Sequence, residues 1–288
     1  MSVVPWDVDA TVDKMAGYVR DVAREIPWAE MIVFHELAAP GVVQFAQPPA
    51  PEYLAGAQQS IPGPLSDRLC ALARRYRRWL LPGSLYELSD GKLYNTAVVI
   101  SPDGEIVAKY RKLFPWLPFE TGFSAGDEFG VFDISGIGRF GLSICYDMWF
   151  PETVRALVWR GAEVILHPTL TTSADRELEL VLGQAHAITN QCYFIDVNGV
   201  GAWGGGLSQI VDPDGRVVQR AGVGEAVMTE LLDLERVTRA REHGTLGMTQ
   251  SLKNLRDSRV RFPQYEDMAA GEGFKTLGPL EPFKNRLH

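Results

Sequence analysis

The strongest constraint on the fold is an alternation of strand-like and helix-like segments along most of the 288 residues. Such alternation is typical of layered α/β proteins rather than of separate all-α or all-β blocks. With 46% hydrophobic residues, a chain of this length can bury a large core, and α/β proteins of this size are often single domains. The sequence therefore predicts one compact α/β unit.

Hydrophobic periodicity and turn residues place the expected elements along the chain. Helices are expected at 12–26, 65–79, 151–160 and 174–191. Strands are expected at 31–34, 80–86, 93–100, 106–109, 140–144, 164–167 and 193–197. The turns Ser89-Asp90-Gly91, Pro102-Asp103-Gly104 and Asp212-Pro213-Asp214-Gly215 predict hairpins. From Thr245 the pattern weakens, so we expect a domain over 1–244 and an arm over 245–288 that packs on the domain or on a partner subunit.

Charge and cysteine content narrow the possible partners and the compartment. A net charge of -8 and a pI near 5.2 argue against nucleic acid or an anionic membrane as a partner. Three cysteines do not make a disulfide framework, and no apolar run approaches the roughly 20 residues of a membrane span. The five histidines lack the paired spacing of a zinc site. We expect a cytoplasmic protein without a metal or other cofactor, acting on a small neutral or polar ligand.

The segment around Cys145 carries the clearest chemical signal. The apolar strand expected at 140–144 ends on this thiol, and Pro151-Glu152 then opens a helix, since proline suits a first helical position and glutamate complements the helix dipole. Open α/β sheets keep their chemistry at the carboxyl ends of strands. We therefore expect an exposed, reactive thiol at Cys145, whereas Cys70 and Cys192 read as ordinary core cysteines.

Two further strand ends carry charged residues that suit a cysteine nucleophile. Such a nucleophile needs a base for its proton and a donor for the oxyanion that forms on attack. No histidine is comparably placed, but Glu36 follows the strand expected at 31–34 and Lys112 follows the strand expected at 106–109. Taken alone, Glu36 reads as a solvated loop acid and Lys112 as part of a basic surface run. Because Glu36 and Lys112 occur together with Cys145, we favour a catalytic site in which the carboxylate takes the thiol proton, the ammonium stabilises the oxyanion and the thiol attacks.

Three segments resemble, in the same order, the signature segments of the nitrilase superfamily of carbon-nitrogen hydrolases. They are Phe34-His35-Glu36, Tyr110-Arg111-Lys112, and Ile144-Cys145-Tyr146-Asp147 with its following Phe150-Pro151-Glu152. The likeness extends from about Asp9 to Val237 and includes the framework segments Tyr94-Asn95-Thr96-Ala97, Pro102-Asp103-Gly104-Glu105, Arg160-Gly161-Ala162-Glu163 and Asp212-Pro213-Asp214-Gly215.

The resemblance implies a four-layer α-β-β-α sandwich and a set of residue roles. Glu36 would be the general base, Lys112 the oxyanion stabiliser and Cys145 the nucleophile. Glu120 fills the place of a second glutamate that orients substrate or assists proton transfer, and the backbone N–H of Tyr146 would be the second oxyanion donor. The chain departs from the pattern in two places: His35 replaces the usual proline before the base, and no edge strand is evident before Pro5.

The residues after the nucleophile divide the superfamily by substrate. Cys145-Tyr146-Asp147 is similar to the amidase branches, whereas nitrile-hydrolysing branches resemble Cys-Trp-Glu. The segment 111–120 is similar to the aliphatic amidase and formamidase type, which implies a small acyl group in a pocket walled by Trp116, Phe119 and Trp149, although each would equally suit core packing. We therefore expect hydrolysis of a small non-peptide amide to the acid and ammonia.

Other activities stay open at this point. An N-carbamoyl amino acid amidohydrolase would need a cation for the substrate carboxylate, and Arg176 would supply it unless it is a helix-surface arginine. A nitrilase, an acyltransferase and a non-catalytic binding module are the remaining alternatives. The resemblance also implies a homo-oligomer of at least two chains, assembled through helices flanking the site and through the C-terminal arm.

Overall fold

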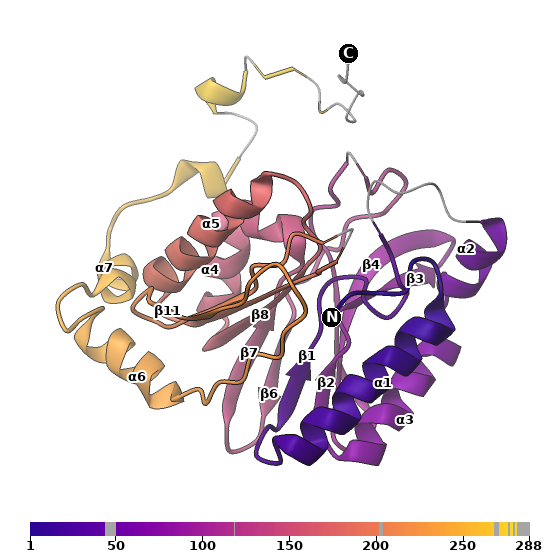
Figure 1. Cartoon of the computed structure of the whole chain (residues 1–288). Coiled ribbons are helices and arrows are strands. Elements are labelled where there is room, and N and C mark those ends of the chain that lie inside the picture. Colours follow the sequence, from indigo (N-terminus) through magenta and orange to yellow (C-terminus); the bar gives the residue numbers. More distant parts are fainter. Residues whose placement is uncertain are drawn as a thin grey trace.

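The computed structural model describes residues 1–43, 50–117, 119–201, 204–267, 271–275, 277–278 and 280. Two sheets pack face to face and helices cover their outer faces, which gives the four layers α-β-β-α (Figure 1). The first sheet contains β1 (Met31–Val33), β2 (Trp79–Leu81), β3 (Ser84–Ser89), β4 (Lys92–Ile100) and β5 (Ile106–Arg111). The second has the order β11-β10-β9-β8-β7-β6, from β6 (Val131–Ile134), β7 (Gly138–Leu142), β8 (Val164–Thr169), β9 (Tyr193–Asn198), β10 (Gln209–Val211) and β11 (Val217–Arg220). The helices are α1 (Val8–Glu25), α2 (Pro51–Ala57), α3 (Pro64–Tyr76), α4 (Pro151–Trp159), α5 (Asp175–Asn190), α6 (Leu234–His243) and α7 (Ser251–Asp257).

The period of two along each strand sorts side chains between neighbouring layers. On β4, Val98 and Ile100 pack with residues of α1 and α3, whereas Ala97 and Val99 face the core between the two sheets. On β8, Ile165 packs under α4 and α5, whereas Val164 and Leu166 face the same inter-sheet core. Both faces of these strands are therefore buried, which explains their nearly continuous apolar sequences.

The ends of the helices follow from local signals. The α1 helix begins at Val8, four residues before the expected start, because the Asp7 side chain caps it by accepting a hydrogen bond from the Ala10 N–H at 2.9 Å. The α3 helix ends at Tyr76 because Arg77 adopts a left-handed conformation with φ of 53° and Trp79 already belongs to β2. The start of α4 at Pro151 is as expected.

The single strand expected at 80–86 is wrong: the segment forms two strands, β2 and β3, separated at Pro82-Gly83. Both pair with β4 in antiparallel orientation, Leu80 with Ile100 and Ser84 with Ala97. Gly83 has a φ of +86°, and a Cβ atom there would overlap the carbonyl oxygen of His35. The break therefore lets the chain pass close to the residue that precedes Glu36.

Substitution Gly83→Ala is expected to lower the free energy of unfolding by more than about 3 kcal/mol, because it adds a steric overlap with the His35 backbone to the cost of a positive φ. Gly91→Ala is the matched control: φ is +72° but nothing lies within 4 Å of the added Cβ, so only about 1–2 kcal/mol is expected. Urea denaturation of both variants measures the difference. Equal losses would show that the close approach at Gly83 is not a packing constraint.

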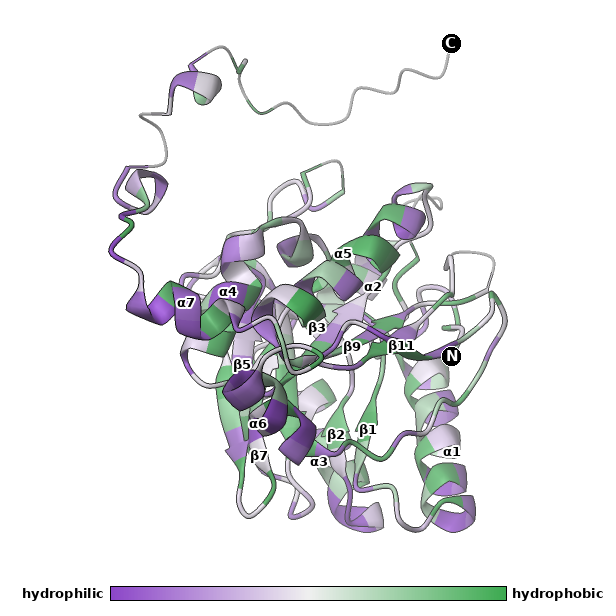
Figure 2. Cartoon of the chain, turned by 90° about the vertical axis from the view of Figure 1, so that its left-hand side faces the viewer, coloured by the Kyte–Doolittle hydropathy of each residue, from purple (hydrophilic) through white to green (hydrophobic). Residues whose placement is uncertain are grey.

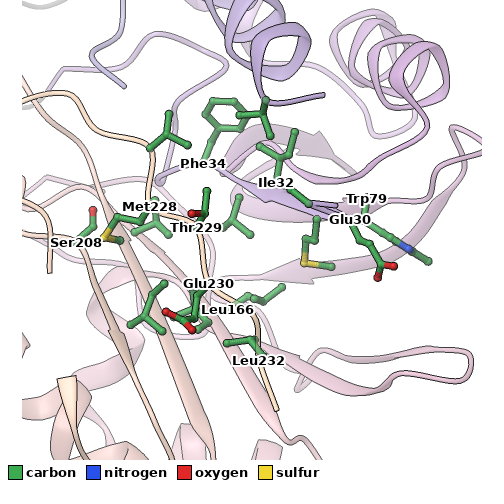
Figure 3. Close-up of a pocket in the computed structure, with 18 of the residues that line it drawn as sticks. Glu30, Ile32, Phe34, Trp79, Leu166, Ser208, Met228, Thr229, Glu230 and Leu232 are labelled. Atoms are coloured by element: carbon green, nitrogen blue, oxygen red, sulfur yellow. The ribbon is translucent and has the colours of Figure 1, made fainter. Parts of the chain in front are cut away.

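The first sheet is open along one edge of β1. Residues 1–7 contain no strand, as the sequence indicated, and β2 is the only strand with which β1 pairs in the described part of the chain. Beside β1 lies a cavity of about 420 Å³, bounded by residues that include Ile32, Phe34, Leu166 and Met228 (Figure 3). Neither Cys145 nor Lys112 borders it, so this cavity is separate from the candidate site.

The C-terminal arm leaves the body of the molecule after α7 (Figures 1 and 2). It includes two short 3-10 turns, Pro263–Tyr265 and Glu272–Phe274. Large apolar side chains of the arm are exposed, among them Met248, Val260, Tyr265 and Leu277. Within the described ranges, each helix is too short or too polar to cross a lipid bilayer.

Candidate active site

Cys145 lies in a sharp turn between β7 and α4. It follows β7 by three residues, starts a 3-10 turn over Cys145–Trp149, and is followed by α4. Its φ of +47° is unusual for a residue with a side chain and costs about 1–3 kcal/mol, which the surrounding structure must offset. The expectation of an exposed thiol is wrong, because Cys145 is only 7% exposed. Side chains from α5 and from the loops after β5 and β8 surround it.

The buried carboxylate of Asp147 fixes this turn. Oδ2 accepts hydrogen bonds from the Ile144 N–H at 3.0 Å and the Tyr110 hydroxyl at 2.7 Å. Oδ1 accepts from the N–H groups of Leu113 and Phe114 at 3.1 and 3.0 Å. Burial raises the pKa of Asp147 to about 6, against the opposing effect of these donors. Asp147 thus ties the turn that carries the thiol to the loop that follows Lys112.

Substitution Asp147→Asn is expected to lower the free energy of unfolding by about 2–4 kcal/mol, because either placement of the amide sets its NH₂ group against buried donors. Any amide-hydrolysing activity should fall with it, since the thiol and Lys112 lose their common anchor. Asp133→Asn is the control, because Asp133 forms an exposed ion pair with Arg139, and no measurable loss of stability is expected. Thermal unfolding measures both, and an unchanged Asp147→Asn protein would refute the anchoring role.

Lys112, Glu36 and Glu120 form a buried charged cluster with Asn95. The Lys112 Nζ lies 3.0 Å from Glu36 Oε1 and 2.7 Å from Glu120 Oε2. The Asn95 Nδ2 donates to both carboxylates, at 2.8 and 2.7 Å. The Trp116 N–H also donates to Glu120, at 2.6 Å. These contacts leave Glu36 Oε2 without a hydrogen-bond partner among the described residues, and therefore available to a nearby proton donor.

Burial and mutual charge set the protonation of this cluster. Burial alone would lower the pKa of Lys112, but Glu120, Glu36 and Cys145 outweigh it and hold that pKa well above its usual value. Burial, aided by Glu120, raises the pKa of Glu36, while Lys112 and the neighbouring Cys145 thiol oppose this shift. Lys112 is therefore a permanent cation, and Glu36 is a carboxyl group of increased basicity.

The resting thiol of Cys145 is protonated. Burial and the charge of Glu36 raise its pKa well above the usual value, more than Lys112 lowers it. Its Sγ lies 3.9 Å from Thr171 Oγ1, which in turn donates to Glu179 Oε1 at 3.0 Å. A thiol in this state becomes nucleophilic only when a base takes its proton.

A small pocket of about 20 Å³ opens onto the sulfur. The expected residues Trp116, Tyr146 and Trp149 line it with Cys145, as do Leu170, Thr171, Ser173, Asp175 and Glu179. Phe119 is not among these lining residues; it packs against a cluster that includes Tyr86 and the pocket residue Leu170. The aromatic wall expected from the sequence therefore loses one of its three members.

The expectation that Arg176 binds a substrate carboxylate is not supported. Its buried guanidinium donates to Asp196 at 3.2 and 2.8 Å, to Glu179 at 3.2 Å, and to the carbonyl oxygens of Gly206 and Leu207 at 3.2 and 2.8 Å. An arginine has five N–H donors, and these contacts use all five. The alternative of a helix-surface arginine is also wrong, because Arg176 is 3% exposed.

His35, which replaces the proline usual in similar sequences, does not remove Glu36 from the cluster. The ring is buried, its Nδ1 lies 2.8 Å from the Glu36 carbonyl oxygen, and burial lowers its pKa to about 4. A neutral imidazole therefore adds no charge beside the carboxylate. Within the described residues, no group of three or more His, Cys, Asp or Glu side chains could hold a metal ion.

The sequence reasoning missed several residues of the site, among them Asn95, Asp147, Thr171, Asp175 and Glu179. Asn95 and Asp147 were within the quoted segments, Asn95 in the Tyr94–Ala97 framework and Asp147 two residues after the nucleophile. Thr171 and Glu179 had no sequence signal, because a threonine in a loop and a glutamate in a helix are unremarkable until the fold brings them to the sulfur.

Comparison with known proteins identifies the family. The family model for carbon-nitrogen hydrolases matches residues 1–242. The chain is 34% identical over 218 residues to omega-amidase NIT2 of Homo sapiens, covering 69% of this chain and 77% of the relative. It is 34% identical over 217 residues to an (R)-stereoselective amidase of Pseudomonas sp, covering 74% and 76%.

A solved structure shows the same architecture. The carbon-nitrogen hydrolase from Helicobacter pylori G27 superposes with a TM-score of 0.76 at 26% identity, covering 92% of this chain and 94% of the other. Three findings point to the same family: the fold has four layers, the family model matches residues 1–242, and the relatives are 34% identical. The chain belongs to the carbon-nitrogen hydrolase family of the nitrilase superfamily.

Proposed function

We propose that this protein is an amidase that hydrolyses small non-peptide amides to the carboxylic acid and ammonia through a thioester on Cys145. The observation that carries the proposal is the placement of Lys112 between Glu36 and Glu120, beside a buried thiol. A base, a cation and a nucleophile are thus gathered in one dry site. The amidase names of the two relatives agree with this chemistry.

In the first half of the reaction, Glu36 accepts the Cys145 proton through its unpartnered Oε2 as the sulfur attacks the amide carbon. Lys112 Nζ and the Tyr146 N–H stabilise the negative oxygen, since the first N–H groups of a helical turn have no acceptor within the turn. Glu36 returns the proton to the leaving nitrogen, and ammonia departs. The acyl group then remains on Cys145 as a thioester.

In the second half, Glu36 takes a proton from a water molecule that attacks the thioester. The tetrahedral intermediate uses the same donors and then collapses to the carboxylic acid, and the proton returns to the sulfur. Glu120 keeps Lys112 charged and positioned, and with Asn95 it links the lysine to the base. The same carboxylate would orient the substrate amide.

The volume and the walls of the pocket favour a substrate with a small acyl group. Its volume of about 20 Å³ is far below the roughly 300 Å³ of a typical ligand site. Trp116, Tyr146 and Trp149 surround it with rigid rings. No observation favours N-carbamoyl amino acids, because Arg176 has no donor left for their carboxylate.

Ammonia release from formamide, acetamide, propionamide and butyramide tests the proposal, with acid formation measured in parallel. Equal amounts of ammonia and acid are expected, together with an acyl adduct on Cys145 in intact-mass spectra of quenched reactions. Release of ammonia without any adduct would contradict the thioester route. Failure to release ammonia from any of these amides would contradict the amidase function itself.

The proposal includes a cytoplasmic homo-oligomer that acts without nucleic acid. In support of a reducing compartment, Cys70, Cys145 and Cys192 are all unpaired. In support of assembly, the arm from 245 onward exposes many apolar side chains, and we propose that it packs on a partner subunit. Light scattering of the full chain should give a dimer or larger species, and a monomer would contradict this part of the proposal.

A further inference from the structure

We propose that the pocket beside Cys145 selects amides whose acyl group is neutral or positively charged and excludes those whose acyl group carries a carboxylate. This inference rests on the proposed amidase function and specifies its substrate class. It follows from the charges of the side chains that surround the pocket.

Two carboxylates of α5 face the pocket. Asp175 and Glu179 both line it, and they stand four residues apart, so they lie on the same face of the helix. Asp175 is partly exposed, whereas Glu179 is 2% exposed and lies beside Thr171, the residue that contacts the sulfur. A bound acyl group therefore lies near two acids on its α5 side.

No basic side chain lines the described part of the pocket beside these acids, although Arg176, which is outside the lining, pairs with Glu179 at 3.2 Å. Among the described residues that line the pocket, none is Lys, Arg or His. Arg176 uses all five of its donors on protein acceptors, and Lys112 is held between Glu36 and Glu120.

The charges around the pocket are unbalanced. Around the pocket and the buried cluster, the cations Lys112 and Arg176 are outnumbered by carboxyl groups, which include Glu36, Glu120, Asp147, Asp175, Glu179 and Asp196. A substrate carboxylate would lose its hydration without gaining a cationic partner, whereas a substrate ammonium would meet carboxylates in a site that salt screens weakly.

The charge state of Glu179 sets the conditions for a test. Burial and the neighbouring Asp196 raise its pKa to about 7, while Arg176 and the Thr171 hydroxyl oppose the shift. Glu179 is therefore mostly ionised at pH 8. Thr171 and Arg176 also fix the direction of its two oxygens, so the negative charge is held in one place.

Three amides of similar size test the selection at pH 8: butyramide, β-alaninamide and malonamate. In β-alaninamide an ammonium replaces the terminal methyl group of butyramide, and malonamate carries a carboxylate at a similar distance from the amide. We expect kcat/KM for β-alaninamide to exceed that for malonamate by at least about 100-fold, because like charges in a dry site repel strongly. Butyramide turnover reports on the proposed function independently of charge.

Variants of the two acids identify the source of the selection. Glu179→Gln and Asp175→Asn should each reduce the ratio of β-alaninamide to malonamate turnover by about tenfold, since each removes one charge near the acyl group. Glu177→Gln is the matched control, because Glu177 lies on the exposed side of α5, and the ratio should not change. If the Glu179→Gln protein fails to fold, the Asp175→Asn protein and the comparison of the three amides with the wild-type protein still test the charge selection.

Each outcome has a distinct meaning. Butyramide turnover combined with preferred hydrolysis of malonamate would overturn the charge selection and leave the amidase function standing. Calorimetric titration of the inactive Cys145→Ala protein with the three amides gives an independent readout, in which malonamate should bind at least tenfold more weakly than β-alaninamide. Failure to hydrolyse any of the amides would overturn the proposed function, and the inference with it.

Discussion

Replacing Cys145 with alanine is expected to reduce amide hydrolysis by about 10⁴- to 10⁶-fold, because no other group can form the covalent intermediate. The protein should remain folded, since the substitution removes one side-chain atom, which lies 3.9 Å from Thr171 Oγ1 and neighbours Glu36. Ammonia release and intact-mass detection of the acyl adduct measure the effect, and both signals should disappear together.

The other cysteines serve as matched controls. Cys70→Ala changes a half-buried residue of α3 and should leave turnover unchanged. Cys192→Ala removes a fully buried sulfur beneath α4 and α5, so it should cost stability of about 1 kcal/mol without altering the rate. Normal activity in the Cys145→Ala protein would refute the assignment of the nucleophile.

Replacing Lys112 with methionine is expected to abolish turnover and to lower the free energy of unfolding by about 3–5 kcal/mol, because it leaves two buried carboxylates without their cation. Glu36 and Glu120 would then raise each other's pKa. A folded-state pKa above the unfolded value means that the folded protein binds more protons, so its stability falls as pH rises. Urea denaturation at pH 5 and pH 8 should show the larger deficit at pH 8.

Two comparisons separate charge from side-chain volume. Lys109→Met removes a cation that pairs with Glu87, but Arg111 still pairs with that carboxylate, so a loss below about 1 kcal/mol is expected. The triple variant with Lys112→Met, Glu36→Gln and Glu120→Gln removes the buried charges and should recover stability without recovering activity. A deficit in Lys112→Met that is independent of pH would contradict the electrostatic explanation.

The sequence was most informative where chemistry coincides with the end of a strand. Glu36, Lys112 and Cys145 each follow a strand, and a layered α/β fold gathers such positions at one edge of its sheets. The four layers were predicted through resemblance, and the structure confirms them. The broken strand at Pro82-Gly83 could also have been predicted, since proline followed by glycine commonly interrupts regular structure.

The contacts around these residues could not be predicted from the sequence in the same way. Neither alternative for Arg176, a substrate clamp or a helix-surface arginine, predicted its burial, because Asp196 and the carbonyl oxygens of Gly206 and Leu207 lie 20 or more residues away in sequence. The surroundings of Cys145 include Thr171 from the loop after β8 and Glu179 from α5. Such contacts arise from tertiary packing, and no local pattern specifies them.

One edge of β1 is open, so the proposed base follows a strand that is held less firmly than the strand before the proposed nucleophile. Glu36 follows a strand of three residues that has one strand neighbour in the described part of the chain and a cavity beside it. Cys145 follows β7, which has strands on both sides, and its turn is anchored by Asp147. Segments with fewer hydrogen-bonded neighbours open at lower free energy than the rest of a fold. On warming, the base would thus separate from the sulfur before the molecule unfolds, and the upper temperature limit of turnover would be set by β1 rather than by the core.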